Sequence, residues 1–136
     1  MSIIARASRE EAVWAAYRLV ASLDPSLRDR EKERHFALAS DSVSIGKTYA
    51  LAKNEWLNPQ LWTGAVHTHG APAVALVGSY EEVAQALIDY ARVGVSQFIL
   101  SGWPKLDEMI LFGKEVLPRV RKLETSLHRS QILKDL

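Results

Sequence analysis

The chain contains no cysteine among its 136 residues. This absence excludes a disulfide framework, a zinc site built on thiolates and a cysteine nucleophile. It also gives no sign of an oxidising compartment, so we place the protein in the cytoplasm by default. Any metal or nucleophilic chemistry must therefore use other side chains.

The sequence also lacks an excess of one charge and a long apolar run. Lys and Arg number 17 and Asp and Glu 16, which gives a formal net charge of +1 and argues against a nucleic-acid partner. No segment approaches the roughly 18 apolar residues that a membrane-spanning helix needs, and the opening segment is too short for a signal peptide, so we expect no membrane partner. The 48% hydrophobic content is typical of one globular domain.

A capping signal near the N-terminus predicts the first helix. Residues 2–6 form a short apolar run, and Ser8 and Glu11 follow it with the spacing of a capping box. Apolar residues then recur at helical spacing until Asp24-Pro25. The pattern predicts a helix that begins just after Ser8 and ends before that proline.

Three further segments complete the first half of the chain. The charged run 28–34 has interspersed signs and is interpreted as the solvated face of a helix rather than a binding tract. Residues 41–56 are predicted to form another helix, which the Asn-Pro pair after it ends. The stretch 58–72 is rich in turn formers and has no clear period, so a functional loop is expected there.

The clearest pattern is a strand, a helix and a second strand. Residues 73–77 are a continuous apolar run, as in a strand buried on both faces. Ser79 and Glu82 form a second capping box, and the helix that they open should end at Gly94 in a left-handed conformation. Residues 95–100 are another apolar run. The two strands are expected to pair in parallel through a right-handed crossover.

The last part of the chain is predicted to be helical. Residues 101–104 turn the chain into a helix from Lys105, and Pro118 is expected to kink or restart it. The sequence has no internal repeat and no low-complexity linker. Alternation of strands and helices along one stretch predicts a single α/β domain.

One block resembles a known enzyme family. Residues 76–118 read LVGSYEEVAQALIDYARVGVSQFILSGWPKLDEMILFGKEVLP. This block resembles the C-terminal end of flavin-dependent, luciferase-like monooxygenases, and within them it is most similar to the alkanesulfonate monooxygenases. The resemblance is carried by LVGS-x-EEVA, the Gly94-Val95 step, the FILSGWP turn and FGKEVLP, and it extends more weakly over nearly the whole chain.

The resemblance implies a partial barrel. The family fold is a (β/α) barrel, which needs about 250 residues or more. By the resemblance, residues 1–136 form a single truncated domain with about three parallel strands, flanking helices and a helical insertion. Such a sheet would leave open edges and one uncovered apolar face. We therefore expect a homo-oligomer, or a complementing barrel half that supplies the absent strands. The alternative is that the long C-terminal helix folds over the bare face.

The resemblance also implies an activity. In the family, reduced FMN reacts with oxygen and the resulting flavin peroxide attacks an organosulfur substrate, with a flavin reductase as partner. The isolated chain is expected to be inactive because most of the barrel is absent. The alternative is a non-catalytic truncated relative that folds and self-associates without binding flavin. A third interpretation, a small helical adaptor, is disfavoured by the strand–helix–strand pattern.

Four residues are candidates for binding roles. By the resemblance, Lys47 matches an arginine that meets the sulfonate, although it also fits a solvated helix lysine. Trp103 corresponds to a tyrosine after the last strand, and it would either wall a pocket or plug a small core. Gly78 and Ser79, at a helix N-terminus, offer backbone N–H groups to a phosphate of the cofactor. They are equally explained as a helix cap, which we favour.

The histidines give a weaker signal. His67 and His69 would point to one side of an extended segment and hold a metal with a carboxylate, but no third ligand is apparent, so an ordinary polar loop is preferred. His35 and His128 give a still weaker indication of metal binding. The Arg-x-His pair of the resembled family is missing, because its His position falls on Ser2. We therefore assign no metal and no catalytic residue to this chain.

Overall fold

A three-stranded sheet forms the centre of the protein. The computed structural model describes residues 1–22 and 42–132. The strands are β1 (Ser2–Arg6), β2 (Leu61–Trp62) and β3 (Ala75–Ser79), in the order β1-β3-β2. β1 and β3 run parallel, whereas β2 is antiparallel to β3. The fold is α/β as predicted, but the sheet is mixed and the expectation of about three parallel strands is wrong.

The helix after β1 begins as its capping signal predicts. Helix α1 (Arg9–Ala21) has Ser8 as its N-cap, and the Ser8 side chain accepts the Glu11 backbone N–H at 3.2 Å. The predicted end at Asp24-Pro25 and the charged run 28–34 lie outside the described residues.

The second predicted helix is shorter than expected. Helix α3 (Val43–Leu51) is capped by Ser42 and ends before residues 52–56. Those residues instead reach the outer side of β2, where Trp56 bridges Trp62. The Leu57 N–H also donates to the Leu61 carbonyl at 2.9 Å. Pairing with a strand thus overrides the helical pattern there.

The predicted loop over 58–72 is wrong in part. It contains β2, the short helix α4 (Val66–His69) and the 3₁₀ turn η1 (Ala71–Ala73). Trp62, Thr63, Ala65 and Val66 are all fully buried. Because buried backbone groups need hydrogen-bond partners, a segment that supplies core residues takes up regular structure.

The second capping box is confirmed in both halves. Helix α5 (Tyr80–Arg92) begins after Ser79, whose N–H donates to Glu82 Oε2 at 2.8 Å, while the Glu82 N–H donates to Ser79 Oγ at 3.2 Å. Gly94 has φ +96°, the left-handed conformation predicted for the residue that ends this helix.

The predicted strand over 95–100 does not form beside β3. The chain instead passes β1, where Ser101 makes a single parallel bridge to Ser2. The Ile3 N–H donates to the Ser101 carbonyl at 2.9 Å, and the Ser101 N–H donates to the Met1 carbonyl at 3.1 Å. β3 is already hydrogen-bonded to β1 and β2. The returning segment therefore has β1, not β3, as its neighbour.

The last helical region has the irregularity predicted for Pro118. Helix α6 (Lys105–Leu111) runs into a π-helical turn, η2 (Phe112–Val116), and then into helix α7 (Leu117–Ile132). Pro118 lacks the N–H that would bond to the carbonyl four residues earlier, and the wide turn lies just before it. No helix in the described part of the chain has the length and apolar character needed to cross a membrane.

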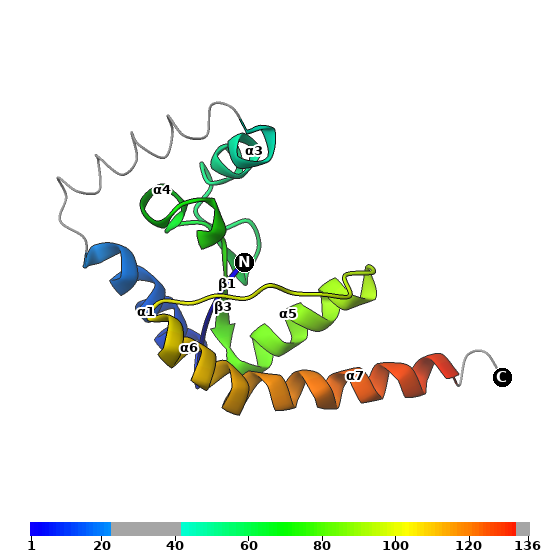
Figure 1. The fold of residues 1–136 in the computed structure, drawn as a ribbon. Coiled ribbons are helices and arrows are strands. Elements are labelled where there is room, and N and C mark those ends of the chain that lie inside the picture. The colour runs from blue at the N-terminus through cyan, green and yellow to red at the C-terminus, as the bar shows by residue number, and fades with distance from the viewer. Residues whose placement is uncertain (23–41, 133–136) are drawn as a thin grey trace.

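Helices cover both faces of the sheet. Ile4 and Val77 pack with α1 in one buried cluster, and Ile3 and Leu76 pack with α5 and Val116 in another. Figure 1 shows α1 and α5 on opposite sides of β1 and β3. The expectation of one bare apolar face is therefore wrong. Helix α1 lies in the connection from β1 to β3, and α5 lies in the connection from β3 back to the segment on the other side of β1. The two connections cross the sheet in opposite directions, so right-handed crossovers place the two helices on opposite faces.

Candidate functional site

The carboxyl ends of the two parallel strands form the candidate site. Arg6 of β1 lies opposite Ser79 of β3 in the strand register. The chain leaves these strands toward opposite faces of the sheet, which creates a topological switch point between them. Ligands of open α/β sheets bind at such points. The charged side chains around this point include those of Arg6, Arg9, Glu82 and Glu108.

Arg6 is held in a two-point ion pair. Its Nη2 lies 2.5 Å from Glu108 Oε1 and its Nη1 lies 3.1 Å from Glu108 Oε2. The hydrogen bond to Glu108 raises the pKa of Arg6 above its ordinary value. Gly102 makes room for this pair, because a Cβ there would lie 2.4 Å from Glu108 Cβ. The Arg6 charge is therefore already matched by a buried carboxylate.

Arg9 bridges the two strand ends. Its Nη1 lies 3.3 Å from Glu82 Oε1, and its Nη2 donates to the Pro59 carbonyl. The guanidinium carbon lies 5.7 Å from the centre of the Trp56 ring. The Arg9 side chain is 37% exposed and that of Arg6 is 27% exposed, so the charge of Arg9 is the more accessible of the two to an external anion.

The predicted phosphate-binding position at Gly78 and Ser79 is occupied by the Glu82 carboxylate. The Ser79 N–H donates to Glu82 Oε2, and a Cβ at Gly78 would lie 2.8 Å from that same oxygen. Glu81 and Glu82 both lie in the first turn of α5, at the positive end of its dipole. These residues form the helix cap and do not fit a phosphate group.

Trp103 lies against the core and a histidine. It is half-buried and packs on the cluster that contains Ile4 and Trp62. The His69 ring meets it edge-on, with 5.2 Å between ring centres. Trp103 follows residues 95–101, which lie beside β1 and not beside β3 as predicted, and it contacts α4.

The two closely spaced histidines do not converge. His67 and His69 lie on helix α4 rather than on an extended segment, so the expectation that they share one side is wrong. The His67 ring lies 5.5 Å from Tyr49, whereas the His69 ring contacts Trp103. Within residues 1–22 and 42–132, no group of three His, Asp or Glu side chains could hold a metal. His35 and the side chain of His128 are outside the described residues.

Lys47 lies on another part of the molecule. It is an exposed residue of α3, which packs against α4 and η1. Trp62 pairs with Ala75, so α4 and η1, which connect these two residues, lie with α3 at the amino end of β3, away from Ser79. The structure does not bring Lys47 together with the strand ends.

The ion pairs at the strand ends are functional candidates that sequence reasoning missed. Arg6 and Glu108 are 102 residues apart in the chain. No periodicity or spacing connects residues that far apart. The only available signals were a charged residue that ends an apolar strand and an acidic residue in the first turn of a later helix.

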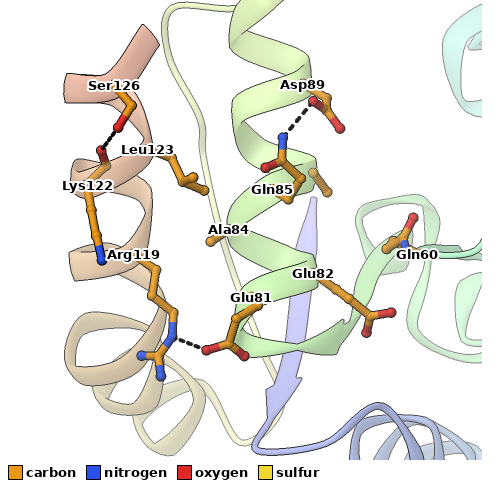
Figure 2. A pocket seen from close by; sticks show the side chains of 11 residues that line it. Gln60, Glu81, Glu82, Ala84, Gln85, Asp89, Arg119, Lys122, Leu123 and Ser126 are labelled. Carbon is orange, nitrogen blue, oxygen red and sulfur yellow. Dashed lines mark hydrogen bonds and ion pairs between the residues drawn. The ribbon is translucent and has the colours of Figure 1, made fainter.

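A groove of about 840 Å³ lies between α5 and α7. Figure 2 shows Glu81 and Arg119 facing each other across it, with Nε and Oε1 2.6 Å apart. Hydrogen bonding to Arg119 lowers the pKa of Glu81. The lining residues are Gln60, Glu81, Glu82, Ala84, Gln85, Ala86, Asp89, Arg119, Lys122, Leu123 and Ser126. The groove offers an apolar floor and a charged rim.

Comparison with known proteins identifies a curated relative. No family model matches the chain. Among curated proteins, the chain is similar to a sulfoquinovose monooxygenase of Agrobacterium fabrum (strain C58 / ATCC 33970), with 35% identity over 125 residues. The match covers 88% of this chain and 31% of the relative. The chain therefore spans about a third of the length of this curated relative.

Proposed function

We propose that the chain is the C-terminal part of a flavin-dependent, luciferase-like monooxygenase that acts on a sulfonate. The observation that carries this proposal is the 35% identity with a monooxygenase over most of the chain. The flavin and the C-terminal position rest on the resemblance of residues 76–118 to that family. The sulfonate rests on that resemblance and on the name of the relative.

In this proposal the chain supplies framework and substrate-side residues. Lys47 meets the anionic group of the substrate as a point charge, and Trp103 provides a flat apolar wall. FMN, when bound, supplies the oxygen chemistry. Gly78 and Ser79 do not fit its phosphate because Glu82 accepts the Ser79 N–H, so in this proposal the flavin is bound by parts outside this chain.

A second candidate function is that of a non-catalytic relative. Two observations favour it: the Ser79 N–H is closed by Glu82, and both faces of the sheet are covered by helices of the same chain. Such a protein would fold without the rest of a barrel and would bind no flavin.

A chimeric enzyme separates the two candidates. The third of the Agrobacterium relative that matches this chain is replaced by this chain, and oxygen-dependent turnover of sulfoquinovose is measured with reduced FMN. We expect turnover, and we expect Lys47→Arg to increase it because a guanidinium binds an oxyanion at two points. Lys53→Arg is the matched control on an exposed lysine and should have no effect. A chimera that melts cooperatively but shows no turnover, with or without Lys47→Arg, would support the non-catalytic relative.

The isolated chain provides a companion measurement. We expect no saturable quenching of its four tryptophans by FMN, because Glu82 holds the position that a phosphate would need. Riboflavin, which lacks the phosphate, is the control ligand. Tight quenching of the tryptophan fluorescence by FMN but not by riboflavin would contradict the conclusion that Glu82 blocks phosphate binding at Ser79.

A further inference from the structure

The turn that carries Trp103 is held on both sides of this residue. Before it, the Ser101 carbonyl accepts the Ile3 N–H of β1 at 2.9 Å. After it, the Pro104 carbonyl accepts the Glu108 N–H at 3.1 Å. The place of the Trp103 backbone therefore depends on β1 and on the first turn of α6.

The Glu108 side chain contacts both this turn and β1. A Cβ at Gly102, the residue before Trp103, would lie 2.4 Å from Glu108 Cβ and 3.4 Å from the Ile3 carbonyl oxygen, so the Gly102 backbone lies close against both. At its other end, the Glu108 carboxylate accepts two hydrogen bonds from Arg6, the last residue of β1. Glu108 thus links the turn to the end of the strand.

The energetics of this ion pair favour a role in position rather than in stability. The Glu108 side chain is 3% exposed and that of Arg6 is 27% exposed. The cost of removing two charges from water offsets much of their attraction, and an apolar pair of similar volume often gives equal or higher stability. The guanidinium–carboxylate pair, however, forms two parallel hydrogen bonds that fix direction as well as distance. An apolar pair cannot reproduce that geometry.

The Trp103 ring reports where the turn lies. It packs on the cluster that contains Ile4 and Trp62, and it meets the His69 ring edge-on with 5.2 Å between ring centres. His69 belongs to α4, in the connection between β2 and β3, whereas Trp103 precedes α6. A small shift of the turn would therefore change the distance between the two rings.

We propose that Arg6 and Glu108 are positioning residues for Trp103, because their ion pair fixes residues 101–104 and so keeps the Trp103 ring against His69. This inference rests on the proposed function, in which Trp103 is the apolar wall of the sulfonate site. Neither charged residue needs to touch the substrate. The Arg6 charge is matched within the protein, and its role is to hold the wall in place.

Replacing both charged residues at once tests the proposal. The double variant Arg6→Met/Glu108→Leu puts an apolar pair of similar volume in their place and should remain folded, which thermal melting checks. We expect NMR spectra of the full chain to lose the nuclear Overhauser cross-peak between the Trp103 and His69 rings in this variant. The indole N–H resonance of Trp14, on α1, should not shift.

Two further variants complete this measurement. Arg119→Met/Glu81→Leu is the matched control, since it replaces another arginine–glutamate pair that joins two helices, and it should retain the cross-peak. Arg6→Lys keeps the charge but meets the carboxylate as a point charge, so it should also displace Trp103. A retained cross-peak in the folded double variant would overturn the proposal, as would its loss in the control. If the double variant does not fold, a retained cross-peak in Arg6→Lys would overturn it.

Turnover of the chimeric enzyme tests the link to the substrate site. The double variant of Arg6 and Glu108 should raise the KM for sulfoquinovose by roughly two- to tenfold with kcat unchanged, as expected for one displaced aromatic contact. Added to Trp103→Ala, it should raise the KM no further, because both changes act through the same ring. A further rise would overturn the positioning role. The NMR measurement needs no turnover, so a displaced ring together with an inactive chimera would support the positioning role and count against the proposed function.

Discussion

At the carboxyl end of β1, one ion pair ties the strand to the last helical region. Glu108 is 3% exposed and accepts two hydrogen bonds from Arg6, whereas Arg6 remains partly exposed. A buried charge without its partner is far more costly than a pair that was never formed. The stability of this corner therefore depends on both residues being present.

Replacing Glu108 tests this dependence. Glu108→Ala should lower the free energy of unfolding by about 3 kcal/mol, near the low end for buried pairs because water still reaches Arg6. Glu81→Ala removes an exposed carboxylate from a pair with Arg119 and should cost no more than about 1 kcal/mol. Urea denaturation of both variants measures the contrast. Equal losses would show that the Arg6–Glu108 pair behaves as a surface pair.

At the scale of elements, Glu81 and Arg119 connect α5 to α7, and this contact should respond to acid. Arg119 lowers the pKa of Glu81 below its ordinary value of 4.5. A lowered folded-state pKa means that the stabilisation is complete above the unfolded pKa and is lost as the pH falls through the folded pKa. Because Glu81 is 66% exposed, the effect should stay below about 1 kcal/mol.

Comparison with Glu81→Gln isolates this contribution. The urea midpoint of the variant should lie slightly below that of wild type at pH 7, and the two should converge well below pH 4.5. High salt should also reduce the difference, since exposed ion pairs are screened. A difference that persists unchanged in acid would mean that the Glu81 charge does not contribute.

Local signals in the sequence predict elements better than they predict partners. Ser8, Ser79 and Gly94 act within a few residues of themselves, so the starts of α1 and α5 and the end of α5 follow from the sequence. The partner of residues 95–100 depends on which strand edge is free. β2 occupies the free edge of β3, and a two-residue strand has no periodic signal in the sequence.

The same limit applies to the candidate site. The resemblance to a family predicts binding roles for Lys47 and Trp103, but a motif match does not predict how far apart the two residues lie. The Arg6–Glu108 pair joins residues from the two ends of the chain, and only the folded backbone brings them together. Sequence reasoning thus identified the segments that surround the strand ends but not the side chains that fill them.

At the scale of the whole molecule, the sheet is a layer between two cores. β1 contributes Ile3 to the cluster with α5 and Ile4 to the cluster with α1. Neighbouring residues in a strand point to opposite faces, so Ile3 and Ile4 place the same type of side chain on the two faces of the sheet. A barrel fragment with its helices on one side would bury only one of them.

The matched variants Ile3→Ala and Ile4→Ala therefore test the two-faced core. The two side chains are 1% and 2% exposed, and each truncation should cost about 2–5 kcal/mol, because both leave a cavity among packed neighbours. Ala5→Gly and Ala7→Gly provide backbone controls in and just after the same strand. Chemical denaturation gives the free energies. If one isoleucine variant lost several kcal/mol and the other almost none, one face of the sheet would be bare in solution, and the helices on that side would not hold the positions described here.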